Sequence, residues 1–249
     1  MWFIAYCARD GLYRWHQTEA LPVDPADPAG SDWVGTSTDI DEMRTLQDRQ
    51  AVLLAELQHR TRNLLGVVQS VSRQTLRSSS SLDEFGREFE GRLRALSRVQ
   101  SLLARVGGER IELRDLVELE IQAHVGQHAE QVVIDGPPVQ IPAISAQALN
   151  LAVHELATNA LKYGALARDT GRLEVSWRLH DGIAPQVELV WRESGVPIPH
   201  APRRKGYGTE LIERALPYQL RAQTRLEFGA DGVVCTIQTP AYPPQEAQE

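Results

Sequence analysis

His59 is the first residue of the chain whose type and place suggest chemistry. It lies in a stretch, residues 40–78, whose apolar side chains recur at three- and four-residue steps, which predicts an amphipathic helix. His59 falls on the side away from the apolar stripe, and its neighbours one helical turn away are Glu56, Arg62 and Asn63. A neutral imidazole carries a free lone pair, and a nearby carboxylate can hold one ring nitrogen while the other attacks. These surroundings suit a nucleophile, although a single surface histidine on a helix is usually only solvated.

A row of three polar residues is the second candidate. Glu155, Asn159 and Lys162 stand at positions i, i+4 and i+7 of a helix expected at 145–164, so they share one face. An acid, a carboxamide and an ammonium in one row can orient a water, ligate Mg²⁺ and meet phosphate oxygens. An ordinary solvated face has the same spacing, and by spacing alone that is the simpler interpretation.

A glycine pair, Gly206 and Gly208, stands directly before a helix expected at 209–216. Backbone N–H groups and the N-terminus of that helix could cradle a phosphate, although loops need glycine for other reasons. Neither a P-loop nor a dinucleotide fingerprint occurs in the chain.

Three groups of elements would position these residues. Residues 1–40 are rich in aromatic and β-branched residues around a proline-rich loop, which predicts two or three strands, too few for a core of their own. Residues 41–107 predict two amphipathic helices broken at Ser78–Ser81, which should form an antiparallel hairpin. In residues 108–240 strands and helices are segregated, so we expect an α+β fold, a two-layer sandwich of helices on a sheet.

The glycine pair Gly107-Gly108 marks the expected boundary between the hairpin and the sandwich, and the proline-rich tail, 241–249, is expected to be disordered. The sandwich should contain strands near 110–113, 131–135, 172–180, 187–192, 224–228 and 233–239, and helices near 115–125, 145–164 and 209–216.

Composition excludes several classes of protein. A formal net charge of −7 argues against nucleic-acid binding, because phosphate contacts need clustered Lys and Arg. The two cysteines, Cys7 and Cys235, form neither a metal-ligand spacing nor a disulfide framework, which favours a reducing compartment. No window approaches the roughly 18 apolar residues that a spanning helix requires. We therefore expect a cytoplasmic protein without a membrane span.

Four blocks of the sequence resemble the boxes of the HWE family of histidine kinases. They are residues 57–63, similar to the phosphoacceptor box, 154–165, similar to the N box, 191–193, similar to the Trp-x-Glu segment, and 206–211, similar to the last glycine box. The blocks occur in the family's order over about residues 50–240, and jointly they are far more specific than any one alone.

The resemblance implies a dimerisation-type helical hairpin at 41–107 followed by a Bergerat (GHKL) ATPase domain at 108–240. His59 would accept the phosphoryl group, with Glu56, Arg62 and Asn63 orienting it. Glu155 would polarise a water or the attacking group.

The same resemblance implies an ATP site. Glu193 would accept a hydrogen bond from the adenine amino group, and Asn159 would ligate Mg²⁺. Gly195 is followed by Val196 where family members often have a second glycine, which questions the flexibility of the lid that the glycines would shape. The implied ATP-binding residues are His154, Asn159, Lys162, Trp191, Glu193, Gly195, Gly206 and Gly208.

The implied function is autophosphorylation of His59 with Mg·ATP, then transfer to an aspartate of a response-regulator receiver domain, by a homodimer formed through the hairpin. A non-catalytic signalling scaffold is the alternative, and a Ser/Thr kinase on the same ATPase fold is weakened because it has no need of the hairpin. Residues 1–40 resemble only the closing strands of a PAS sensor, so we expect either a remnant sensor or a piece of a longer one. The implied transfer is open to both a cis and a trans route.

Overall fold

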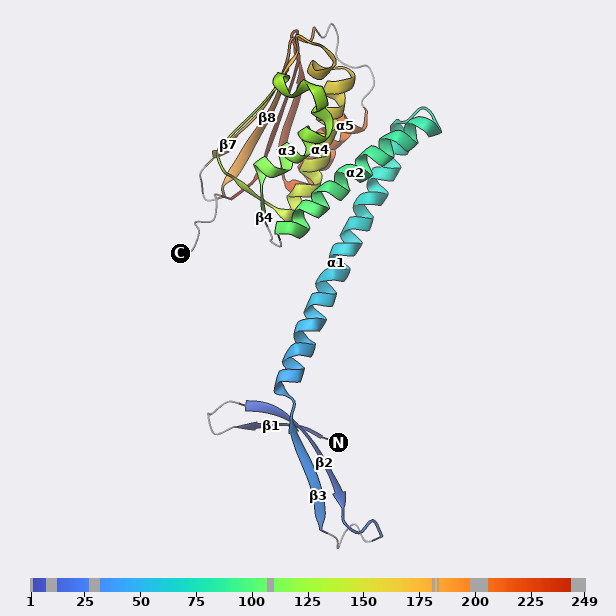
Figure 1. Cartoon of the computed structure of the whole chain (residues 1–249), viewed down its shortest axis with the longest axis vertical. Helices are drawn as coiled ribbons and strands as arrows, with labels where there is room; N and C mark the ends of the chain where they lie inside the picture. The colour runs from blue at the N-terminus through green and yellow to red at the C-terminus, as the bar shows by residue number, and fades with distance from the viewer. Residues whose placement is uncertain are drawn as a thin grey trace. The chain divides into compact units, whose positions relative to one another are not determined.

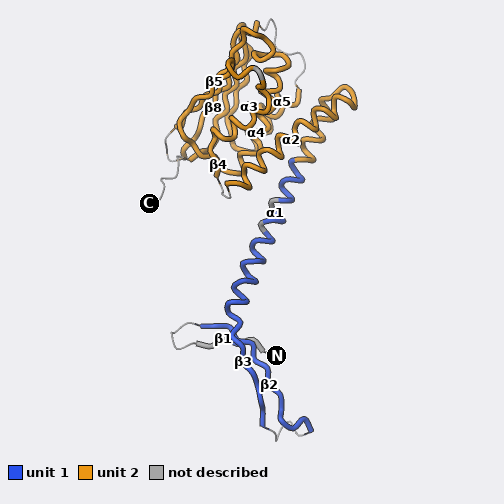
Figure 2. Tube along the Cα trace, in the orientation of Figure 1, with its two compact units in different colours: residues 1–67 blue, residues 68–249 orange. Residues whose placement is uncertain are grey.

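The computed structural model describes residues 2–7, 13–26, 32–106, 110–180, 182, 184–197 and 206–242. The chain divides into two compact units, residues 1–67 and 68–249, and the division falls inside one long helix (Figure 2). The expected boundary at Gly107-Gly108 and most of the expected tail lie outside the described residues. Within the described part of the chain, no helix is long and apolar enough to cross a membrane.

The first unit contains a three-stranded antiparallel sheet, as residues 1–40 predict. Its strands β1 (Trp2–Cys7), β2 (Tyr13–Pro22) and β3 (Trp33–Asp39) are paired in that order. The helix that follows is joined to the sheet by short-range polar contacts. Asp39 Oδ1 accepts the backbone N–H of Asp41 at 3.0 Å, and Asp41 Oδ1 accepts the N–H of Trp15 at 3.1 Å. The Arg44 guanidinium stacks on the Trp15 ring at 4.2 Å, so the first turn of the helix is attached to β2.

Two helices, α1 (Asp41–Ser78) and α2 (Leu82–Val106), are separated by the serine-rich break that the sequence predicts. Ser81 Oγ accepts the N–H of Glu84 at 3.1 Å, and the Glu84 carboxylate accepts the N–H of Ser80 at 2.6 Å. This reciprocal arrangement resembles a capping box and fixes the start of α2. The hydrogen bonds from Ser80 hold the pKa of Glu84 below its usual value.

The apolar stripe of α1 is covered over only part of its length. Leu53 and Leu57 are 69% and 61% exposed within the described chain, whereas Val71 is buried. Because α2 has 25 residues and α1 has 38, the second helix can cover only part of the first. The stripe is therefore uncovered toward its N-terminal end.

The second unit is a two-layer sandwich of helices on one five-stranded sheet, as the segregated pattern predicts (Figure 1). The strand order is β5-β7-β8-β10-β9, with β5 parallel to β7 and the other pairs antiparallel; β4 and β6 form a separate pair. The bounds are β4 (Arg110–Glu112), α3 (Leu113–Val125), β5 (Val132–Asp135), β6 (Gln140–Pro142), α4 (Ala143–Lys162), β7 (Arg172–His180), β8 (Gln186–Ser194), α5 (Tyr207–Glu210), α6 (Leu216–Leu220), β9 (Gln223–Phe228) and β10 (Val233–Pro240).

Some features of this unit were not predicted from the sequence. The short strand β6 was not predicted, and a π-helical turn at Leu211–Ala215 carries the last helix on to Leu220. Tyr242 exchanges two backbone hydrogen bonds with Gln140, so the chain stays attached to β6 beyond residue 240.

The core lies between the helices and the inner face of the sheet. Alternate residues of β7 are buried, Leu173, Val175 and Trp177, while their neighbours face outward. Most of α4 is buried against this face, although Leu161, predicted on its buried side, is only half-buried. The helix is thus fixed by packing along nearly its whole length.

Helix α2 also packs against α3 and α4, and buried polar contacts join them. Arg98 forms hydrogen bonds with both carboxylate oxygens of Glu120, at 2.5 and 2.6 Å, and Glu120 is 0% exposed. Asn150 donates to the backbone carbonyl of Ala95 at 3.0 Å. Burial would raise the pKa of Glu120, but His154 and Arg98 outweigh it, so this pKa lies below its usual value. The second hairpin helix is therefore part of the packing of the second unit.

Removing the cation of this pair should destabilise the fold. Arg98→Ala leaves a carboxylate buried without its main partner, which costs about 3–5 kcal/mol of unfolding free energy. Arg94→Ala is the matched control, because Arg94 pairs with Glu90 on the exposed side of the same helix; its cost should stay below about 1 kcal/mol. Since the folded-state pKa of Glu120 is lowered, the pair's contribution is present above the carboxyl's unfolded pKa and is lost as pH falls through the folded value. Equal denaturation midpoints for the two variants at neutral pH would contradict this assignment.

Candidate active site

Helix α4 carries the predicted row of Glu155, Asn159 and Lys162, but the three side chains differ in burial. Asn159 and Lys162 are exposed, whereas Glu155 is only 6% exposed. The exposed half of the row is therefore open to a ligand, and the Glu155 half is covered by neighbouring elements.

The last glycine box lies directly on this row. A Cβ atom on Gly208 would lie 3.1 Å from Cβ of Glu155 and 3.5 Å from Nδ2 of Asn159, so only glycine lets the backbone approach this closely without displacing a neighbour. Gly206 stands just before α5, with open space beside it. Two motifs about fifty residues apart in the sequence thus form one surface.

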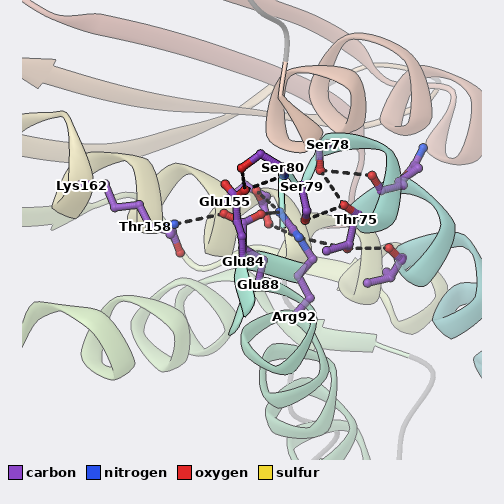
Figure 3. A network of polar contacts seen from close by, with 12 residues as sticks. Thr75, Ser78, Ser79, Ser80, Glu84, Glu88, Arg92, Glu155, Thr158 and Lys162 are labelled. Atoms are coloured by element: carbon purple, nitrogen blue, oxygen red, sulfur yellow. Dashed lines mark hydrogen bonds and ion pairs between the residues drawn. The ribbon is translucent and has the colours of Figure 1, made fainter. Parts of the chain in front are cut away.

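Arg92 of α2 binds the buried end of the row (Figure 3). Its Nε donates to Glu155 Oε1 at 2.8 Å, and a terminal nitrogen donates to Glu155 Oε2 at 3.1 Å. The guanidinium also donates to Thr75 Oγ1 at 3.0 Å and to Glu88 at 3.1 Å, and it stacks on the Tyr207 ring at 4.0 Å. Burial opposes the charge of Arg92, but Glu155 outweighs it and the pKa of Arg92 is raised. Burial also raises the pKa of Tyr207.

Glu88, one turn before Arg92, reaches the other end of the row. Its Oε1 lies 3.2 Å from Nζ of Lys162, in a pair whose side chains are 24% and 45% exposed respectively. One basic and one acidic residue of α2, Arg92 and Glu88, thus pair with Glu155 and Lys162 of the α4 row.

The Trp-x-Glu spacing places Trp191 and Glu193 together on the inner face of β8, because residues two apart in a strand point to the same side. Trp191 Nε1 donates to Glu193 Oε1 at 3.0 Å, and the N–H of Ala165 donates to Oε2 at 2.8 Å. Burial raises the pKa of Glu193, which is 4% exposed. Gly164 lies so close that a Cβ atom there would overlap Glu193 Oε2.

His154 lies apart from the exposed part of the row. Its side chain is 7% exposed, with Nδ1 3.6 Å from Glu120 Oε2 and the ring 4.9 Å from that of His124. Glu120, His124 and His154 offer three ligand atoms within 4.8 Å of one another, but Arg98 already pairs with both oxygens of Glu120, so we assign this cluster to helix packing. The implied role of His154 in ATP binding stays a prediction.

Gly195 closes the end of β8 in a conformation that suits glycine. Its φ is +76°, and a Cβ atom would lie 2.8 Å from the carbonyl oxygen of Thr170. Val196, the residue that departs from the family pattern, is buried, and its N–H donates to the carbonyl of Asp231 at 2.9 Å. The start of the expected lid is therefore fixed, and residues 198–205 of it lie outside the described chain.

In the first unit His59 is exposed on α1. Asn63 Nδ2 lies 3.5 Å from its Nδ1, which brings one predicted orienting residue to the ring. The Arg62 guanidinium donates to the carbonyl of Gln58 at 3.3 Å. The Glu56 side chain lies outside the described part of the structure. The orienting roles of Arg62 and Glu56 stay predictions.

Arg92 is the main residue that sequence analysis missed, although a signal was present. It lies four residues before Leu96 and seven before Val99, so it falls on the buried stripe of α2 rather than on its polar face. A charged residue within an apolar stripe indicates a buried partner of opposite charge.

Comparison with known proteins agrees with this geometry. Residues 56–138 match the HWE histidine kinase family. Blue-light-activated histidine kinase 1 of Erythrobacter litoralis is 33% identical over 247 residues, covering 95% of this chain and 67% of that protein. The blue-light-activated histidine kinase of Brucella ovis is 30% identical over 94% of this chain, which spans 48% of that relative.

A solved structure has the same fold. The Erythrobacter litoralis EL346 blue-light activated histidine kinase superposes with a TM-score of 0.52 at 23% identity, covering 96% of this chain and 75% of that one. The sandwich thus has the fold found in a histidine kinase. The chain belongs to the HWE histidine kinase family.

The close approach of Gly164 to Glu193 should be visible as a stability difference between two glycine variants. Gly164→Ala forces Glu193 out of its hydrogen bonds, and such overpacking costs about 1–3 kcal/mol. Gly86→Ala is the control within α2, where the new methyl group meets no atom within 4 Å; it should stabilise by about 0.5–1 kcal/mol. Thermal or urea unfolding of both variants decides the matter, and equal shifts would refute the described packing at Gly164.

Proposed function

We propose that this histidine kinase transfers the γ-phosphoryl group of Mg·ATP to its own His59 and then to an aspartate of a response-regulator receiver domain. The observation that carries the proposal is the packing of Gly208 on Glu155 and Asn159. It joins the glycine box, which suits phosphate, to the polar row, which suits a metal-bound triphosphate.

The exposed residues of α4 fit the ligands that the proposal requires. The Asn159 amide oxygen is a hard ligand of the kind that Mg²⁺ takes, and the Lys162 ammonium can meet phosphate oxygens. When bound, Mg²⁺ supplies neutralisation of the phosphate charge. A carboxylate oxygen has more than one lone pair, so Glu193 can accept from an adenine amino group while it keeps its bonds from Trp191 and Ala165.

The proposed transfer is a displacement at phosphorus. A neutral His59 ring attacks through Nε2, an Nε2–P bond forms, and the bond from phosphorus to the β,γ-bridging oxygen breaks, so that ADP leaves with the electron pair. The ring releases its Nδ1 proton to solvent. Asn63 Nδ2 is the amide atom beside Nδ1. Rotating the amide by 180° would place its oxygen there instead, where it accepts from Nδ1–H and holds the ring in the tautomer whose lone pair lies on Nε2.

The proposed partners follow from the hairpin and from the first sheet. The exposed Leu53 and Leu57 support a homodimer formed through the hairpin, because a second copy would cover them. The attachment of Asp41 and Arg44 to Trp15 supports signal entry from the sheet into α1. The relatives are named for activation by blue light; for this chain we propose a sensory input at the same end.

His59→Ala should abolish acid-labile label after incubation with γ-labelled ATP and Mg²⁺, because the accepting nitrogen is gone. His180→Ala removes another partly exposed histidine, at the C-terminal end of β7, and should label like the wild type. Full labelling of the His59→Ala variant would show that His59 is not the phosphoryl acceptor.

Asn159→Ala should weaken Mg·ATP binding by about tenfold or more, since a ligand to a charged group is lost. The residue is exposed, so the melting temperature should stay unchanged, and Gln122→Ala, an exposed amide on α3, is the control. Binding of a fluorescent ATP analogue gives the measurement. Unchanged affinity would remove Asn159 from the site, and tight binding without any phosphohistidine would favour the signalling scaffold.

A further inference from the structure

Four structural elements meet at the guanidinium of Arg92. Thr75 comes from α1, Glu88 from α2 itself, Glu155 from α4 and Tyr207 from α5. Figure 3 shows Arg92 reaching between Thr75, Glu88 and Glu155. The hairpin, the N box and the glycine box are thus joined at one cation.

These contacts occupy groups that the proposed reaction needs. Both carboxylate oxygens of Glu155 accept from Arg92, so any attacking group that Glu155 is to polarise must share these oxygens with the guanidinium. The Lys162 ammonium is paired with Glu88, so a phosphate oxygen must compete with a carboxylate for it. Asn159, between them in the row, is exposed.

The two pairs differ in strength because they differ in burial. Arg92 and Glu155 are 3% and 6% exposed, and removing one partner of such a pair leaves a charge in a dry interior. Glu88 and Lys162 are partly exposed and screened by solvent. The Glu88 pair can therefore open first, whereas separating Arg92 from Glu155 is costly as long as α2 stays packed on α4.

We propose that α2 is an inhibitory element built into the hairpin, which holds Glu155 through Arg92 and Lys162 through Glu88 until the hairpin rearranges. The hydrogen bond from Arg92 to Thr75 of α1 gives the route, because a displacement of α1 against α2 changes the contacts of the same guanidinium. This inference rests on the proposed function of the α4 row.

The decisive variant is Glu88→Gln, which removes the carboxylate charge beside Lys162. The new amide oxygen can still accept the hydrogen bond from Arg92, and Arg92 keeps its buried charge partner Glu155. We expect the dissociation constant of a fluorescent ATP analogue with Mg²⁺ to fall about 1.5- to 5-fold. This range corresponds to the free energy that a partly exposed ion pair usually contributes. The initial rate of labelling of His59 at subsaturating ATP should rise by a similar factor. Glu90→Gln is the matched control, because it removes the exposed Glu90–Arg94 pair of the same helix and should change neither quantity.

A second variant tests the buried pair. Arg92→Lys keeps a cation but loses the planar fork that meets both oxygens of Glu155, so the labelling rate at saturating ATP should rise although the melting temperature falls. If this variant does not fold, Glu88→Gln decides alone.

The outcomes separate the two proposals. If the wild type forms no phosphohistidine, the proposed function fails, while the binding measurement still tests the inhibitory contact. If the wild type is active and Glu88→Gln binds ATP no more tightly than Glu90→Gln, the contact is merely structural and this inference is overturned.

Discussion

The burial of Arg92 is the constraint on which the arrangement of the second unit depends. A guanidinium that is 3% exposed is tolerated only where other groups replace its water, and those groups must come from the elements around it. Thr75, Glu88 and Glu155 supply them from α1, α2 and α4. Apolar packing alone would allow α2 to slide or turn along α4, whereas a charge with fixed directional partners permits one register.

Regular patterns explain why much of the fold was predictable. β7 was expected at 172–180 and has these bounds, because its inward residues alternate without interruption. The Trp191–Glu193 pair likewise lies on one face of β8, as a spacing of two requires. The α4 row was predictable in the same sense, since helical spacing determines which residues share a face.

The remaining features depend on contacts that no local pattern contains. Helical periodicity assigned Glu155 to a polar face but did not indicate that α2 covers this end of the face. The three residues of β6 are too few for any period, and they pair with β4, from which α3 and β5 separate them in the sequence. The apolar stripe of α1 predicted burial for Leu53, which is exposed because a periodicity specifies a face and not the length of its partner.

Adjacent residues of α4 contact adjacent residues of α2, and this has a thermodynamic consequence. Beside the Arg92–Glu155 pair, a Cβ atom on Gly91 would lie 3.5 Å from the ring of His154, so the N box packs closely on the hairpin. The proposed nucleotide chemistry and the docking of the hairpin would therefore use the same turn of one helix. Any ligand that needs Glu155 free favours the undocked hairpin, and by linkage undocking favours that ligand by the same factor. If Glu155 serves the proposed transfer, coupling between the hairpin and the nucleotide site requires no long pathway, because docking and catalysis then share one carboxylate.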